Sequence, residues 1–278
     1  MTPRELLRLL TAELSAAGVP DAEVDASLLL SHVTGQPPLN LRLDSWTQVS
    51  AEDEAAVRAL CEKRRTRMPL QYVLGVQPFL GRDFHVDERV LIPRPETELL
   101  AERAIAALRR HESPVALDLC CGSGCLAVSM ALGDPRAHVH AADLSAGALA
   151  VTRMNAEALG AKLTLHQGDL FAALPEGLRF HVIVSNPPYI PAADCLELQT
   201  EVRREPLMAL DGGADGYDFY RRIAKEAPGR LLPGGTLLME VGFDQADMVM
   251  SLCVQAGLTP VGIHEDYQHI PRMVEARL

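Results

Sequence analysis

The sequence predicts an α/β fold in which a mostly parallel sheet follows a small all-helical unit. Two observations support this prediction. Leucines recur at helical spacing through the first 70 residues. From residue 115 onward, short apolar runs alternate with helical segments, which is typical of strands joined by crossover helices. The length of 278 residues suits one large domain with a small one beside it.

The N-terminal unit, which we place at residues 1–74, is predicted to be helical. Thr2 and Glu5 have the spacing of a capping box at the start of the first helix. Asp21 is expected to cap a second helix, and Ser50 to open a third. Nothing in this unit resembles a catalytic group. It is either a packing cap or a docking module for a macromolecular partner, and the sequence leaves both interpretations open.

Short alternating runs with glycines over residues 69–86 suggest a β-hairpin. We place this hairpin linker at residues 75–95 and the large domain at residues 96–278. Arg94 lies between two prolines in an extended segment at the edge of the large domain. It is expected either to form a surface salt bridge or to line a cleft.

The large domain is expected to hold five strands of a mostly parallel sheet and a closing antiparallel pair. The five runs and the closing pair cover residues 115–119, 138–143, 162–167, 180–185, 234–241, 259–264 and 272–277. Because ligands of open α/β sheets bind at the carboxyl ends of the strands, the residues that follow these runs are the candidate site.

A glycine loop follows the first of these strands and opens a helix. Its residues are Cys120, Cys121, Gly122, Ser123 and Gly124. Glycines let a backbone approach a ligand and aim the N–H groups of a helix N-terminus at it. The same spacing fits the dinucleotide fingerprint, and Asp143 at the end of the next strand suits a ribose hydroxyl pair in either case.

Three features favour S-adenosylmethionine over NAD as the cofactor. Asp118 lies inside the loop motif, where it can organise the loop and face a cationic methionine end. Asp169 ends the third strand, where its carboxylate can accept a hydrogen bond from an adenine amino group. The chain also lacks a second catalytic domain and a convincing general acid for hydride chemistry.

A rigid corner follows the fourth strand. It consists of Asn186, Pro187, Pro188 and Tyr189. Prolines lack N–H donors and disfavour helical backbone in the residue before them, so the chain must turn here. Stiffly held acceptors beside an aromatic ring suit a planar NH₂ group, whereas the simpler interpretation is a strand-ending turn with a packed tyrosine.

These motifs together resemble a class I methyltransferase that acts on planar nitrogen. Further segments narrow the resemblance: Gln71-Tyr72, Phe79-x-Gly81, Ile92-Pro93-Arg94-Pro95-Glu96-Thr97, Glu205-Pro206 and Asp211-Gly212-Gly213-x-Asp215-Gly216. The whole chain resembles the peptide chain release factor glutamine methyltransferase (HemK-type) family. The resemblance implies a class I S-adenosylmethionine-dependent methyltransferase fold with a seven-stranded, mostly parallel sheet. It also implies that the helical unit helps to hold a release factor while its Gly-Gly-Gln loop enters the cleft.

Carried over by position, the resemblance assigns the site residues. Cys120 to Gly124 would border the methionine part of the cofactor, Asp143 would hold the ribose, and Asp169 and Leu170 would flank the adenine. The residues from Asn186 to Tyr189 would bind the substrate glutamine. The chain departs from the family pattern at three positions. The family often has glycine at position 120, an aromatic residue at position 170, and glycine in the middle of the Asp266-x-x-His269-x-x-Arg272 segment.

The implied activity is N-methylation of the glutamine side-chain amide in the Gly-Gly-Gln motif, which belongs to translation termination. We expect the Asn186 side-chain oxygen and the Pro187 carbonyl to accept the two amide hydrogens, with Tyr189 packed against the amide plane. The alternatives are methylation of a ribosomal protein glutamine, an amino methyltransferase acting on nucleic acid, and a binding module without turnover.

Composition narrows these alternatives. A net charge of −11 argues against an extended nucleic-acid surface, because Lys and Arg dominate phosphate binding. No run approaches the ~20 apolar residues of a membrane span, so no membrane partner is expected. Six cysteines in a chain of this length suggest the reducing cytoplasm rather than a disulfide framework. Cys120, Cys121 and Cys125 lack zinc spacing, so no metal is expected. The oligomeric state cannot be read from the sequence.

Overall fold

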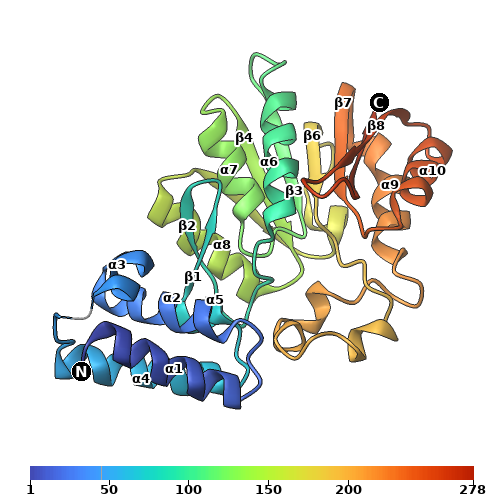
Figure 1. Cartoon of the computed structure of the whole chain (residues 1–278). Coiled ribbons are helices and arrows are strands. Elements are labelled where there is room, and N and C mark those ends of the chain that lie inside the picture. The colour runs from blue at the N-terminus through green and yellow to red at the C-terminus, as the bar shows by residue number, and fades with distance from the viewer. Residues whose placement is uncertain (45) are drawn as a thin grey trace. The chain divides into compact units, whose positions relative to one another are not determined.

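The computed structural model describes residues 1–44 and 46–278, which form two compact units. The first unit comprises Met1–Val76 together with Gln199–Arg204, and the second comprises Gln77–Leu198 and Glu205–Leu278. Figure 1 shows the elements of both. Among the described residues, no helix is both long and apolar enough to cross a bilayer.

The first unit is helical. Its helices are α1 (Pro3–Ala16), α2 (Ala22–Thr34), α3 (Pro38–Leu43), α4 (Ala51–Arg65) and α5 (Leu70–Leu74). The predicted capping box is confirmed, because the Thr2 hydroxyl accepts from the Glu5 N–H and the Glu5 carboxylate accepts from the Thr2 N–H. The leucine stripe of α1 is fully buried, so amphipathic packing holds this unit together.

Two local predictions for this unit are only partly confirmed: Asp21 occupies the N-cap position of α2, and residues 70–74 are helical like the rest of the unit, but each differs in detail. Asp21 precedes α2 but makes no side-chain capping bond. Residues 70–74 form helix α5 rather than part of a hairpin. The helix begins after Pro69 and ends at Gly75, whose φ of +72° is the usual left-handed stop. Over five residues, the alternation of apolar side chains could not separate a helical turn from a strand.

A buried ion-pair network also stabilises the first unit. Arg64 of α4, with only 6% of its side chain exposed, donates to Asp25 of α2 at 2.7 Å. Its guanidinium also lies 3.0 Å from Glu201, which Arg67 contacts at 2.6 Å. The segment Gln199–Arg204 therefore belongs to the helical unit through ion pairs in which each buried charge has a partner of opposite sign.

A hairpin of β1 (Val76–Phe79) and β2 (Arg82–His85) follows, and all of it except Val76 belongs to the second unit. Helix α6 (Pro95–Leu108) follows. The alternating part consists of β3 (Val115–Leu119), α7 (Cys125–Gly133), β4 (His138–Asp143), α8 (Ala146–Leu159), β5 (Leu163–Gln167), β6 (Phe180–Ser185), α9 (Asp218–Arg230), β7 (Leu231–Glu240), α10 (Ala246–Gln255), β8 (Thr259–Glu265) and β9 (Pro271–Arg277). Short 3₁₀ turns, including η1 (Leu170–Ala173), lie in the connections.

Strands β3 to β9 form one sheet in the order β5-β4-β3-β6-β7-β9-β8. The first five strands in this order are parallel, and β9 pairs antiparallel with both β7 and β8. The predicted seven-stranded, mostly parallel sheet is confirmed. The chain winds from β3 toward β5 and then crosses back to β6 on the other side of β3, so the topological switch point lies between β3 and β6.

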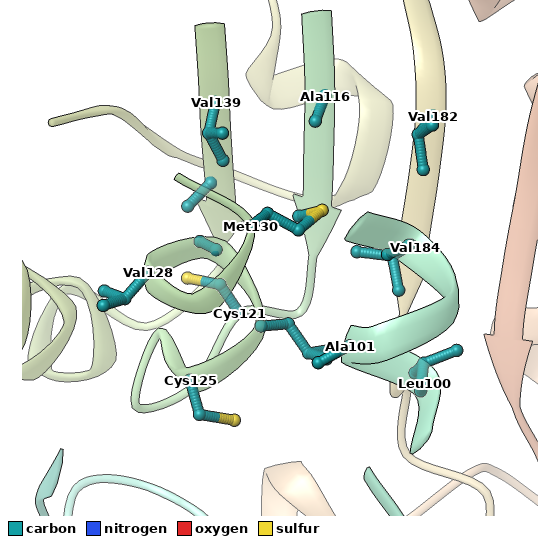
Figure 2. Close-up of a cluster of buried hydrophobic side chains, with 14 of the residues drawn as sticks. Leu100, Ala101, Ala116, Cys121, Cys125, Val128, Met130, Val139, Val182 and Val184 are labelled. Carbon is teal, nitrogen blue, oxygen red and sulfur yellow. The ribbon is translucent and has the colours of Figure 1, made fainter. Parts of the chain in front are cut away.

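Alternate residues of the strands pack into two cores, one on each face of the sheet. One core joins Ala116, Val139 and Val182 to helices α6 and α7, as Figure 2 shows. The other core joins Leu117, Ile183 and neighbouring side chains to α9 and α10. Strands buried on both faces need continuous apolar runs, which explains why these runs were visible in the sequence.

Candidate active site

A cavity of about 430 Å³ lies at the carboxyl ends of the parallel strands in the second unit. This is where the switch point places a ligand. Its lining includes these predicted site residues: Cys120, Cys121, Gly122, Ser123, Asp143, Asp169, Leu170, Asn186 and Pro188. The structure thus brings together residues from the ends of four strands. Asp118, Gly124, Pro187 and Tyr189 are not part of the lining.

The glycine loop is tight because α7 begins directly after its last residue, Gly124. Gly124 has a φ of +78°, and a Cβ there would lie 2.6 Å from the Thr152 Cγ2 of α8. Only glycine satisfies both conditions. A Cβ on Gly122, by contrast, would meet nothing within 4 Å, so the loop presents bare backbone beside the cavity.

Asp118 supports the loop from within the sheet. Its side chain is fully buried, and its Oδ2 accepts a hydrogen bond from the Ala127 N–H at 3.0 Å. Burial raises the pKa of this carboxyl well above its ordinary value. Asp118 therefore fixes the first turn of α7 and does not itself reach the cavity surface.

Asp143 ends β4 and holds two backbone segments of the site. Its Oδ2 accepts from the Gly122 N–H and its Oδ1 from the Ser145 N–H, both at 2.9 Å. Burial raises the pKa of Asp143, and these backbone hydrogen bonds oppose that rise. The carboxylate couples the glycine loop to the start of α8 at the cavity wall.

Asp169 and Leu170 follow β5 and differ in exposure. The Asp169 side chain is half exposed and pairs with Arg222 at 2.6 Å. Leu170 is buried, packing an apolar side chain between the cavity and the second core. The two residues thus give this end of the cavity one hydrogen-bond acceptor and one apolar surface.

The three departures from the family pattern all fall on left-handed backbone. Cys120, Leu170 and His269 have φ values of +61°, +48° and +60°. Glycine would adopt this conformation without strain at each of these positions. The turn at His269 nevertheless persists, because Asp266 Oδ1 accepts from the Ile270 N–H at 3.1 Å.

The rigid corner is tied to two other elements by side-chain hydrogen bonds. Asn186 Nδ2 donates to the Thr97 hydroxyl of α6 at 3.4 Å. The Thr97 hydroxyl in turn donates to Glu240 Oε2, at the end of β7, at 2.7 Å. Burial raises the pKa of Glu240 to about 7. Asn186 lines the cavity, so the corner contributes a residue with a carboxamide side chain to the cavity wall.

Glycines hold the backbone of the corner from the other side. A Cβ on Gly212 would lie 2.7 Å from the Tyr189 Cα, and one on Gly216 would lie 2.5 Å from the Tyr189 carbonyl oxygen. Gln245 Nε2 donates to that same carbonyl at 3.0 Å. The Tyr189 ring packs against the second core, where burial raises the pKa of its phenol to about 12.

Sequence reasoning assigned no role to two residues that shape the site. Glu205 is buried and accepts from the Ile92 N–H at 3.0 Å and from Arg94 at 2.6 Å. Thr97 is buried and donates to Glu240 at 2.7 Å. Thr97 and Glu205 both lie in segments on which the family resemblance rests, and this was the one feature of the sequence that could have pointed to a role for them.

The described residues hold no group of three or more His, Cys, Asp or Glu side chains arranged for a metal ion. Cys120, Cys121 and Cys125 all line the cavity as free thiols. Burial raises the pKa of the Cys125 thiol to about 12, so it is not poised as a nucleophile.

Comparison with known proteins shows the family to which the chain belongs. The model of the PrmC N-terminal domain matches residues 5–75, and the model of the methyltransferase small domain matches residues 96–202. A release factor glutamine methyltransferase of Geobacter sulfurreducens is 42% identical over 278 residues, covering 100% of this chain and 97% of the relative. The chain belongs to the release factor glutamine methyltransferase family. Another member, from Bordetella pertussis, is 44% identical over 267 residues, covering 96% of this chain and 98% of the relative.

Solved structures agree with this family's fold. A methyltransferase from Pyrococcus furiosus superposes with a TM-score of 0.55 at 18% identity, covering 78% of this chain and 98% of that one. A 16S rRNA N2 G1207 methyltransferase of Thermus thermophilus, in complex with AdoMet and guanosine, gives a TM-score of 0.53 at 21% identity. It covers 73% of this chain and 49% of the other. Both likenesses confirm the methyltransferase fold.

Proposed function

We propose that this protein transfers a methyl group from S-adenosylmethionine to the glutamine side-chain amide in the Gly-Gly-Gln motif of peptide chain release factors. The observation that carries this conclusion is the match to release factor glutamine methyltransferases over the whole chain, helical unit included. The geometry agrees with it, because a side-chain amide at the cavity wall suits a carboxamide substrate.

The cavity suits a nucleoside cofactor in size and in chemistry. Its volume of about 430 Å³ falls within the usual range of about 300–1,000 Å³ for small-ligand pockets. We assign the bare backbone of Gly122 and the neighbouring cysteines to the methionine part. We assign Asp143 to the ribose hydroxyls, and Asp169 with Leu170 to the adenine.

An amide nitrogen is a poor nucleophile because its lone pair is delocalised into the carbonyl. When bound, S-adenosylmethionine would supply an electrophilic methyl group and leave as S-adenosylhomocysteine, while the amide nitrogen loses one proton, which we expect to pass to water. The protein's contribution is to orient the nitrogen. We propose that Asn186 Oδ1 and the Pro187 carbonyl accept the two amide hydrogens, so that positioning and electrostatics lower the barrier. Pro187 lies between two residues that line the cavity.

Tyr189 and the helical unit keep their predicted roles as proposals. Tyr189, the last residue of the corner, would pack against the plane of the substrate amide. The domain at residues 1–74 would dock the release factor, and the hairpin linker at residues 75–95 would join it to the methyltransferase domain at residues 96–278. We place the reaction in the reducing cytoplasm, a prediction from the cysteine content. We expect no direct binding to nucleic acid.

The decisive experiment is methyl transfer from labelled cofactor to purified release factor, followed by location of the label. We expect labelling of the Gly-Gly-Gln glutamine, and none when that glutamine is replaced by alanine. Parallel reactions with a ribosomal protein and with RNA test the alternatives. Label on either of those substrates, with none on the release factor, would overturn the proposal. Any turnover excludes a module that only binds cofactor.

A further inference from the structure

The carboxamide of Asn186 has two faces of opposite polarity, and only one of them suits the proposed chemistry. Its oxygen accepts hydrogen bonds and its NH₂ group donates them. A substrate amide that offers N–H groups needs the oxygen. Which way Asn186 points therefore decides whether the corner can bind its substrate productively.

Two buried groups determine that choice: the Glu240 carboxylate, where a side-chain hydrogen bond from Asn186 opposes the rise in pKa that burial causes, and the Thr97 hydroxyl with its single proton. The Thr97 hydroxyl donates to Glu240 Oε2 at 2.7 Å, so its proton is committed to that carboxylate. The Thr97 oxygen can then only accept, and the group of Asn186 that faces it at 3.4 Å must be the NH₂. This arrangement leaves Asn186 Oδ1 available to the substrate.

The support beneath Asn186 is rigid and dry. Thr97 and Glu240 are 2% and 1% exposed. The Tyr220 hydroxyl donates to the Glu240 backbone carbonyl at 2.9 Å, which fixes the end of β7. Ser185, the last residue of β6, pairs in register with Met239 of the adjacent parallel strand β7, and Asn186 and Glu240 each come one residue after this pair. A buried carboxylate is costly to keep in a core, so its presence here calls for a function.

We propose that Thr97 and Glu240 are positioning residues that lock the Asn186 carboxamide with its oxygen toward the substrate nitrogen. The inference rests on the proposed function and extends it to two residues that do not touch the reacting atoms. It also predicts that the lock depends on the charge of Glu240. A protonated Glu240 can donate to Thr97, which frees the Thr97 proton to donate to Asn186 and favours the reversed amide.

The direction of the pH effect follows from burial, which raises the pKa of Glu240 to about 7. The lock is complete above this pKa and is lost as the pH falls through it. The titratable or charged groups that face Glu240 are Glu96, Arg272, Tyr189, Tyr220 and Cys125. Burial raises the pKa of Tyr189 and of Cys125 to about 12, so neither titrates in this range.

The test compares Thr97→Val, Thr97→Ser and Glu240→Gln in the full-length enzyme. Thr236→Val, which removes a buried hydroxyl elsewhere on β7, is the matched control. The readouts are kcat and KM for release factor methylation, the pH profile from 6 to 9, and S-adenosylhomocysteine affinity by calorimetry. We expect Thr97→Val to lower kcat by about 10- to 100-fold with little change in cofactor affinity.

The serine variant should recover most of this loss because it restores the hydroxyl. Glu240→Gln should lower kcat and remove the fall in activity below about pH 7. Wild-type kcat in Thr97→Val, or a serine variant as slow as the valine variant, would overturn the inference. So would equal losses of kcat and cofactor affinity, which indicate a merely structural role. Failure of the wild-type enzyme to methylate release factor would instead overturn the proposed function.

Discussion

Gly216 offers a direct test of how the rigid corner is held. Its backbone lies against Tyr189, with a φ of +79°. An added Cβ would lie 2.5 Å from the Tyr189 carbonyl oxygen and 2.9 Å from Gln245 Nε2, the two atoms that form a hydrogen bond to each other. The substitution Gly216→Ala therefore strains the local backbone and also displaces the corner.

The two effects have different sizes. Left-handed backbone costs a non-glycine residue about 1–2 kcal/mol, partly offset by about 0.4–1 kcal/mol from the stiffer unfolded chain. Ordinary carbon contacts need about 3.5–4.0 Å, so the Tyr189 carbonyl must shift by about 1 Å. Loss of its hydrogen bond from Gln245 adds about 1 kcal/mol. A misplacement of about 1 Å at a site can lower kcat by about 100-fold.

Gly177→Ala separates strain from displacement. Gly177 has a φ of +75°, but a Cβ there would meet nothing within 4 Å. Urea unfolding and methyl-transfer kinetics on both variants would show a similar backbone penalty, with the larger stability loss and the fall in kcat confined to Gly216→Ala. If both variants lost the same stability and kept wild-type kcat, the glycines around the corner would not position it.

Three further predictions concern single side chains. Asn186→Ala should lower kcat by orders of magnitude while S-adenosylhomocysteine still binds, as calorimetry and the labelled-methyl assay would show; retained turnover would contradict its role. His269→Gly should raise the free energy of unfolding by about 0.5–1 kcal/mol in urea, because it relieves left-handed strain at an exposed turn. The Arg67 guanidinium lowers the pKa of Glu201 from 4.5 to about 2, so the stability from this pair is complete above pH 4.5 and is lost as the pH falls toward 2. Glu201→Gln should flatten that part of an acid-unfolding curve, and an unchanged curve would refute the linkage.

The parallel strands at the centre of the fold were predictable because each of them is marked by a run of neighbouring apolar residues. Three strands, 115–119, 138–143 and 180–185, have the bounds that their apolar runs predicted. Strand β7 begins three residues before the predicted start, at Leu231, because Gly234 and Gly235 interrupt its apolar pattern. A strand that is buried on both faces needs consecutive apolar residues, so it can be recognised in the sequence. A glycine inside a strand interrupts that run and obscures where the strand begins.

The site was predictable only as far as strand ends determine it. Asp143, which ends β4, and Asn186, which directly follows β6, were expected at the cavity and line it. Asp118 was expected to organise the loop and to face the cofactor. It organises the loop through a backbone N–H at the start of α7, but it is not among the residues that line the cavity. Arg94 pairs with Glu205, 111 residues away, and no local pattern specifies such a partner.

The orientation of Asn186 is the clearest case of chemistry that depends on long-range packing. The asparagine directly follows β6, while the hydroxyl that orients it lies 89 residues earlier in α6. The carboxylate that accepts the hydrogen bond of this hydroxyl lies 143 residues further along the chain, at the end of β7. The four-residue corner therefore supplies a stiff backbone but not the direction of its amide. That direction exists only when α6 and two neighbouring strands are packed in register, so damage to the sheet near β7 should reduce turnover before it abolishes cofactor binding.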